Sequence, residues 1–115
     1  MRSSVKIVKK PWGHEIWYAQ APKYVGKILT INKGHRLSRQ YHNVKHETIY
    51  TLKGRWLLEL GGKTLVQKPG MAVAIPPKTV HRFCAPYGRV TILEASTPEV
   101  EDVVRLSDDY GRTRK

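Results

Sequence analysis

The stretch RQYHNVKHE, residues 39–47, gathers side chains that can bind a metal ion or move a proton. It holds two of the five histidines of the chain, a glutamine and one of the nine acidic residues. Side chains two positions apart on a strand leave the same face, so Gln40 and His42 point the same way if this segment is extended. Glu47 breaks that alternation, so a turn must re-aim the chain before it. From these residues alone two interpretations stay open: a metal site, or the polar face of a strand and its turn.

The elements around this stretch are short strands. Runs rich in β-branched and aromatic residues alternate with turns that contain glycine or proline, which is typical of an all-β sandwich or barrel. The clearest hairpin has Gly61 and Gly62 between two apolar runs. The expected strands are 24–31, 47–52, 55–60, 63–67, 71–75, 81–85 and 89–95. Thr97 and Pro98, followed by acidic residues, instead predict a short helical turn over 98–104.

The distribution of charge indicates an anionic partner. The chain carries 21 Lys and Arg against 9 Asp and Glu, a formal net charge of +12 at pH 7. Before residue 94 there are 17 cations and only three acids, Glu15, Glu47 and Glu59. Such a field favours phosphorylated metabolites, nucleotides or nucleic acid, although a lysine-rich surface that only aids solubility has the same composition. Because zinc-finger spacing, a recognition helix and basic runs interleaved with aromatics are all missing from the sequence, we do not expect nucleic acid as the partner.

Length and cysteine content predict a single cytoplasmic domain. A chain of 115 residues buries roughly two-thirds of its unfolded surface, enough for a core without staples. Cys84 is the only cysteine, which rules out an internal disulfide framework. The start, MRSSVKIVKK, lacks the apolar stretch of a secretory signal, and no segment approaches the roughly 18 apolar residues of a membrane span. We therefore expect one domain over 1–115, with its barrel core at about 24–95 and no membrane partner.

Two motifs in the chain resemble the two motifs of the cupin family. The first consists of Gly34, Gln40, His42, Glu47 and Gly54, with glutamine where the commonest pattern has histidine. The second consists of Gly70, Pro76, Lys78 and His81, with lysine where glycine is usual. They occur in order, about 16 residues apart, and the resemblance covers roughly residues 26–95. It implies a small double-stranded β-helix, the cupin jelly-roll barrel.

The same resemblance implies a metal inside the barrel, held by the residues that match its motifs, Gln40, His42, Glu47 and His81. An amide oxygen, two imidazoles and a carboxylate suit one borderline divalent ion, zinc first, with nickel, cobalt, manganese or iron(II) as alternatives. Four protein ligands leave one or two open positions on a five- or six-coordinate ion, as a catalytic metal requires. Each residue taken singly also has a structural interpretation, as a buried histidine, a strand amide bonded to backbone, an ion-paired acid or a turn residue.

Longer segments resemble a narrower group of cupins. These segments are residues 10–19, 34–54, 75–82 and 101–112. They look like the cupin domain that ends the bifunctional mannose-1-phosphate guanylyltransferase/mannose-6-phosphate isomerase proteins and that also occurs alone as a type II phosphomannose isomerase. The residues that match the family form of the first motif are Leu37, Ser38, Gln40, His42 and Glu47. Lys45 stands at an arginine position, and Thr48 and Ile49 replace a His-Trp pair.

This resemblance implies interconversion of mannose 6-phosphate and fructose 6-phosphate through an enediol. A divalent metal would stabilise negative charge on the two reacting oxygens while a side chain carries the proton between C1 and C2. Glu94, which matches an acid in the family, is the predicted proton carrier; its structural alternative is an ion pair with Arg89 or Lys27. Lys27, on a strand expected to line the barrel, joins Glu94 as a catalytic residue and is also a third candidate for the phosphate. Arg82 and Lys45, beside predicted ligands, are expected to bind the phosphate of the sugar.

Two other functions fit the same residues. A cupin that only binds a sugar phosphate or sugar nucleotide would keep the barrel and its basic mouth without turnover. A small-molecule dioxygenase would use iron(II) in the same barrel, although that class usually has histidine in place of Gln40. In each case we expect a homodimer, because the segment PWGHEIWYA, residues 11–19, offers an open strand edge whose backbone groups need covering.

Overall fold

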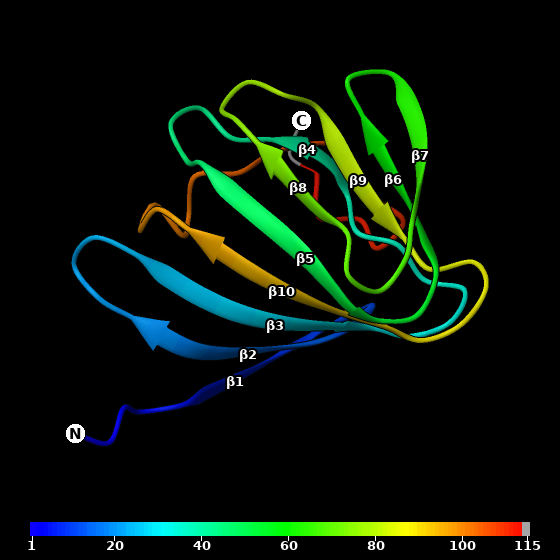
Figure 1. Cartoon of the computed structure of the whole chain (residues 1–115). Helices are drawn as coiled ribbons and strands as arrows, with labels where there is room; N and C mark the ends of the chain where they lie inside the picture. Colours follow the sequence, from blue (N-terminus) through cyan, green and yellow to red (C-terminus); the bar gives the residue numbers. More distant parts are fainter. Residues whose placement is uncertain (114–115) are drawn as a thin grey trace.

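Residues 1–113, the part of the chain that the computed structural model describes, form eleven strands in two antiparallel sheets (Figure 1). The six-stranded sheet has the order β1-β2-β3-β10-β5-β8, with the bounds Lys6–Lys10, Gly13–Gln20, Val25–Ile31, Val90–Ser96, Glu47–Lys53 and Ala72–Ile75. The five-stranded sheet has the order β11-β4-β9-β6-β7, with the bounds Val104–Ser107, Arg39–Tyr41, His81–Cys84, Trp56–Leu60 and Lys63–Gln67. The predicted all-β jelly roll is confirmed.

The seven strands predicted from the sequence are all present, with ends that differ by no more than one residue. Leu60 pairs with Lys63, so Gly61 and Gly62 make the predicted two-residue hairpin. The sheets extend beyond residues 24–95 through β1, β2 and β11. The prediction that residues 11–19 form an open edge is wrong, because β1 pairs with β2 and is itself the edge of the six-stranded sheet.

The predicted helical turn over 98–104 is also wrong. Residues 98–103 instead make tight turns, in which Val100 N donates to Pro98 O at 2.8 Å and Asp102 N donates to Glu99 O at 3.2 Å. Strand β11 then begins at Val104 and pairs with β4. Pairing with a distant strand overrides the local helix-start signal, since propensity is only a weak preference. The described residues contain no helix long and apolar enough to cross a membrane.

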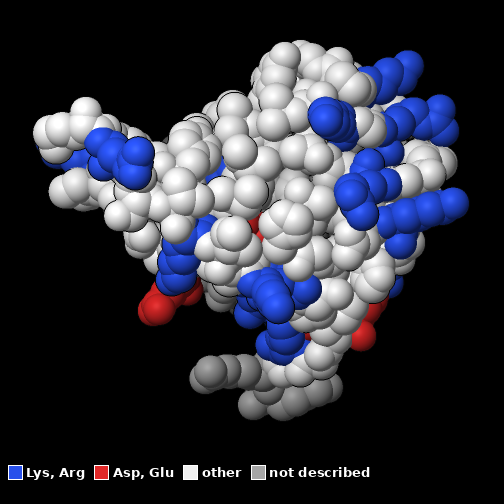
Figure 2. All heavy atoms as spheres, turned by 90° about the horizontal axis from the view of Figure 1, so that it is seen from below, with Lys and Arg blue, Asp and Glu red and all other residues white. Residues whose placement is uncertain are grey.

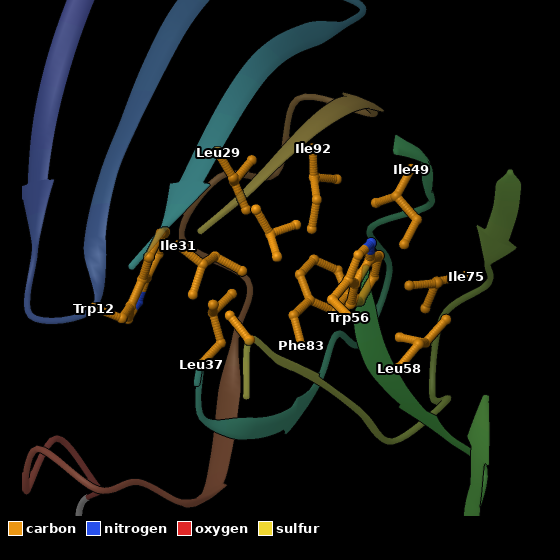
Figure 3. Packing of buried hydrophobic residues seen from close by; sticks show 12 residues of the cluster. Trp12, Leu29, Ile31, Leu37, Ile49, Trp56, Leu58, Ile75, Phe83 and Ile92 are labelled. Carbon is orange, nitrogen blue, oxygen red and sulfur yellow. The ribbon is translucent and has the colours of Figure 1, made fainter. Parts of the chain in front are cut away.

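Apolar side chains from both sheets fill one end of the barrel (Figure 3). Trp56 and Phe83 pack edge to face with their ring centroids 5.1 Å apart. The indole Nε1 of Trp56 donates to Thr51 Oγ1 at 2.8 Å, so this buried donor is satisfied inside the core. Around this pair lie Trp12, Leu29, Ile31, Leu37, Ile49, Leu58, Ile75 and Ile92. This packed end provides a rigid frame for the opposite end.

Inward-facing positions change from apolar to charged along three neighbouring strands. The buried inward residues of β3, β10 and β5 are, in turn, Ile31, Leu29 and Lys27; Val90, Ile92 and Glu94; and Thr51, Ile49 and Glu47. Alternation along each strand keeps all of these side chains on the inner face. The register places Lys27 opposite Glu94, and Glu47 opposite Ser96. The three charged groups therefore meet at the same end of the barrel, beyond the apolar core.

Gly54 and Gly70, one from each motif, differ in how closely other backbone atoms approach them. Gly54 and Gly70 have nearly the same backbone angle, φ 88° and 91°. A Cβ on Gly54 would lie 2.6 Å from Arg89 O, whereas a Cβ on Gly70 would meet nothing within 4 Å. We expect Gly70→Ala to lower the free energy of unfolding by about 1–2 kcal/mol through backbone strain alone. Gly54→Ala should lose about 1–3 kcal/mol more, because its methyl group overpacks against backbone. Urea unfolding measures both; equal losses would show that the close approach is without consequence.

Candidate metal centre

His42, Glu47 and His81 form a compact buried group at the charged end of the barrel. Each offers a ligand atom, and these atoms all lie within 4.8 Å of one another. His81 Nε2 is 3.3 Å from Glu47 Oε1, and His42 Nε2 is 3.9 Å from Glu47 Oε2. His42 directly follows β4, while Glu47 begins β5 and His81 begins β9. The group therefore joins both sheets of the barrel.

The free atoms of this group fit a divalent cation. His42 Nδ1 bonds to Asp102 O, and His81 Nδ1 bonds to Thr79 O at 2.9 Å. Because a carbonyl oxygen only accepts, each Nδ1 carries the proton and each Nε2 presents a lone pair. Both Nε2 atoms are buried without a hydrogen-bond partner, and both face the Glu47 carboxylate. Two lone pairs directed at a carboxylate repel it unless a cation lies between them, so these residues can hold a metal ion.

A cavity lies at this end of the barrel, lined by His42, Glu47 and Glu94 among others, and Gln40, the fourth predicted ligand, lines it too. It lies opposite His81 in the pairing of β4 with β9, and residues that face each other across an antiparallel pair share one face. Its Oε1 accepts a hydrogen bond from Ser38 Oγ at 2.6 Å. Since an amide oxygen has two lone pairs, Ser38 orients the group and leaves one acceptor position.

The protonation states of this group suit metal binding. Burial by itself would raise the pKa of Glu47, but the contact with His81 and the charge of Lys45 lower that pKa to about 2. Burial lowers the pKa of His42, so its imidazole is neutral at pH 7. A charged carboxylate and a neutral imidazole are the forms that bind metals, so no proton has to leave these two groups first.

Lys45 connects Glu94 with the group formed by His42, Glu47 and His81, called the metal group below. Its Nζ lies 3.2 Å from Glu47 Oε2 and 3.3 Å from Glu94 Oε2. Burial would lower the pKa of Lys45, but the charges of Glu94 and Glu47 outweigh it and raise that pKa. Burial and the repulsion from Glu47 raise the pKa of Glu94 to about 7. Glu94 thus pairs with Lys45, rather than with Arg89 or Lys27, and its pKa lies near neutral pH.

Lys27 lines the wall of the cavity, where Glu15 and Trp17 hold it. Its Nζ is 3.6 Å from Glu15 Oε1 and 4.2 Å from the centroid of the Trp17 ring. Trp17 Nε1 in turn donates to Glu15 Oε1 at 2.8 Å. A cation over an indole face and beside a carboxylate is well stabilised, so Lys27 is a fixed positive charge on that wall.

Arg82 is not brought to this cavity, although it follows His81 in the sequence. Adjacent residues on a strand point to opposite faces, and His81 occupies the inner one. Arg82 Nε donates to Leu37 O at 2.8 Å, and its Nη2 lies 3.3 Å from Ser107 Oγ. The side chain is buried beneath β11, where it joins that strand to the barrel.

Three cations that sequence reasoning missed line the cavity instead: Lys10, Arg105 and Arg112. Arg105 lies opposite Gln40 in the pairing of β11 with β4, and its buried Nε has no hydrogen-bond partner. Burial and the nearby Arg112 lower the pKa of Arg105. Arg105 and Arg112 lie in an acid-rich C-terminal segment, so the charge distribution did not single them out; the resemblance noted over residues 101–112 was the signal that could have found them. Among the charged residues on the face of the molecule seen in Figure 2, Lys and Arg are far more prominent than Asp and Glu.

The ligand group yields a direct binding prediction. We expect the chain, once stripped with chelator, to bind one zinc ion, and His42→Ala with His81→Ala to weaken binding by at least about 100-fold, more than the loss of an outer contact causes. Competition with a chromogenic zinc chelator measures the affinity. The double variant His14→Ala with His46→Ala removes two histidines outside the group and should bind as the unaltered chain does. Unchanged stoichiometry and affinity in the first variant would contradict the site.

Comparison with known proteins identifies a matching family and several relatives. The family model described as the cupin domain matches residues 27–93. The alginate biosynthesis protein AlgA of Pseudomonas aeruginosa is 30% identical over 111 residues, which cover 92% of this chain and 23% of that protein. A mannose-1-phosphate guanylyltransferase of Escherichia coli is 26% identical over 109 residues, which cover 91% of this chain and 23% of that protein. The chain thus spans about a quarter of the length of these relatives.

Solved structures agree on the fold. Pac13, described as a nucleoside dehydratase, superposes with a TM-score of 0.77 at 16% identity, covering 94% of this chain and 92% of that chain. An RmlC-like cupin from Shewanella frigidimarina superposes with a TM-score of 0.76 at 16% identity, covering 89% of this chain and 98% of that chain. The family match covers more than half of the chain and coincides with the barrel and its buried His/Glu group, so the protein belongs to the cupin family.

Proposed function

We propose that this cupin is a metal-dependent sugar-phosphate isomerase that interconverts mannose 6-phosphate and fructose 6-phosphate. One observation carries the proposal: a single cavity is lined by His42 and Glu47 of the group able to hold a metal, by an acid with a pKa of about 7 and by several cations. One relative is a mannose-1-phosphate guanylyltransferase, and its name concerns a mannose phosphate, which supports the substrate class. Zinc remains the ion that we propose first, and a homodimer remains a prediction.

The chain would divide the reaction between two sets of residues. A divalent ion held by His42, Glu47 and His81, with Gln40 as the proposed fourth ligand, would supply Lewis-acid stabilisation of negative charge on O1 and O2 of the sugar. Glu94 Oε2 takes the proton from C2 of the open-chain aldose, and the same carboxyl returns it to C1. The hydroxyl proton passes from O2 to O1, so atoms and charge balance. A base with a pKa near 7 serves both directions.

Lys45 keeps this base in place. Its Nζ bonds to Glu94 Oε2 at 3.3 Å, which orients the carboxylate toward the cavity that both residues line. The same ammonium group lies between Glu94 and Glu47 and offsets the repulsion of two buried acids. Lys45 is therefore engaged with acids, and we assign the phosphate of the substrate to other cations.

The size and the lining of the cavity support a proposed position for the phosphate. Its volume is about 90 Å³, below the roughly 300 Å³ at which pockets begin to enclose whole ligands. We therefore propose that the reacting end of the sugar lies beside Glu47 and Glu94, and that the phosphate binds at the cations of the same cavity, Lys10, Arg105 and Arg112. Arg105 has an unused buried Nε–H, and arginine binds phosphate through paired charge-assisted hydrogen bonds.

Turnover separates this function from mere binding of a sugar phosphate. Mannose 6-phosphate incubated with the zinc-loaded chain in heavy water should give fructose 6-phosphate with deuterium at C1, because the carboxyl exchanges its proton with solvent between the two transfers. Stripping the metal should stop the reaction. Glu94→Gln should lower kcat by at least about 100-fold with little change in KM. A folded, zinc-loaded chain that binds mannose 6-phosphate without product or exchange would be a binding module.

The phosphate assignment makes a separate prediction. Replacing Arg105 with Gln should raise KM for mannose 6-phosphate by about 10- to 100-fold, since hydrogen bonds to charged groups contribute about 1.5–3 kcal/mol. The dissociation constant or KM for unphosphorylated mannose should change little, because this sugar has no phosphate for Arg105 to bind. Arg89→Gln is the matched control, because Arg89 is exposed and does not line the cavity. Equal effects of Arg105→Gln on both sugars would mean that this arginine only shapes the wall.

A further inference from the structure

Asp102 bonds to four consecutive residues next to the metal group. Its carboxylate accepts the backbone amides of Asn43 at 3.0 Å, Val44 at 2.7 Å and Lys45 at 3.0 Å. Its backbone carbonyl accepts the Nδ1 proton of His42. Asp102 lies about 60 residues away in the sequence. One residue thus contacts His42 and most of the turn that leads from it to Glu47.

The turn depends on this outside support. Asn43 and Val44 are exposed, yet their amides point at the Asp102 carboxylate and not at a backbone acceptor within the turn. The next amide, that of His46, bonds to Thr97 Oγ1 at 3.0 Å, so it too is held by the C-terminal segment. Three amides converging on one carboxylate form a charge-assisted cluster, and they keep the pKa of Asp102 low, at about 2. Without Asp102 this turn has no fixed backbone partner between Asn43 and Lys45.

The contact with His42 bears on the metal group directly. A ligating imidazole is oriented by the acceptor at its other nitrogen, which sets both the ring plane and the tautomer. For His42 that acceptor is the carbonyl of Asp102, whose position is in turn held by the amides of residues 43–45. The side chain and the carbonyl of Asp102 therefore act together on the same short stretch.

We propose that Asp102 is a positioning residue of the metal centre: it holds the 43–45 turn and the His42 ring in the arrangement that a divalent ion requires. Through the same turn it places Lys45 between Glu47 and Glu94. The proposal rests on the metal site of the proposed function, but not on the identity of the substrate. It assigns a role in the metal centre to the C-terminal segment, whose described residues, up to 113, contribute none of the three grouped ligand atoms.

The test compares Asp102→Ala and Asp102→Asn with Glu101→Gln. Glu101 is an exposed neighbouring acid, so its variant matches the loss of charge without the loss of these bonds. Three quantities are measured on the full chain: zinc affinity by chelator competition, hydrogen exchange of the 43–45 amides, and the His42 tautomer from ¹⁵N shifts. Amide exchange and the His42 tautomer are measured on metal-free protein. They therefore test the role of Asp102 even if the chain proves to have no isomerase activity.

Asp102→Ala keeps the carbonyl that accepts from His42 but removes the carboxylate that holds the 43–45 turn. We expect it to lower zinc affinity by about 10- to 100-fold, the usual effect of disturbing an outer contact of a ligand. The amides of Asn43 and Val44 should exchange at least about tenfold faster, and His42 should no longer hold a single tautomer. Asp102→Asn keeps one acceptor oxygen and should give a smaller loss of the same kind, which covers the case that the alanine variant does not fold. Glu101→Gln should match the unaltered chain. Zinc affinity within twofold of the unaltered chain in both Asp102 variants, with unchanged amide exchange, would overturn the proposal.

Discussion

The buried charge of Glu47 is the constraint on which the charged end of this barrel depends. Its side chain is only 2% exposed, so water does not solvate the carboxylate. Three groups surround it, the Lys45 ammonium and the Nε2 atoms of His42 and His81. Removing one partner of a buried ion pair commonly costs about 3–5 kcal/mol. The arrangement therefore ties the 43–45 turn, β5 and β9 to one carboxylate, and it leaves two imidazole lone pairs aimed where a cation would complete the balance.

The packed core makes this concentration of charge possible. Apolar residues of both sheets fill the other end, with Trp56 and Phe83 at their centre (Figure 3). Because β3, β5 and β10 run through both regions, the register that packs Leu29 against Ile92 also sets Lys27 opposite Glu94. A slip of one residue would turn every inward side chain outward. The same hydrophobic pattern that stabilises the fold thus determines which charged groups face the cavity.

The C-terminal segment completes the site from a distance. It supplies Arg105 and Arg112 to the cavity wall and Asp102 to the ligand turn. It is fastened along its length, since Asp109 holds Arg36 and Tyr110 holds His35 at 2.8 Å. Arg105 lies on β11 and faces Gln40 of β4, which comes two residues before His42. A phosphate bound to Arg105 would therefore be held by the strand next to β4. The proposed phosphate contact and the turn that follows His42 would thus both depend on the C-terminal segment.

By itself the sequence determined the strands and the residues of the metal group. Alternating apolar positions and glycine turns mark each predicted strand, and motif spacing singled out His42, Glu47 and His81, which the structure groups together. It did not reveal the cavity wall: Arg82 was chosen because it follows His81, yet strand alternation turns it away, and Arg105 enters only because β11 pairs with β4. The helical signal over 98–104 failed for the same reason. Local sequence patterns indicate the secondary-structure propensity of a segment and which face of a strand each side chain occupies. The partners of Asp102 and Arg105 lie some 60 residues away in the sequence, and strand pairing, which no local pattern encodes, brings them together.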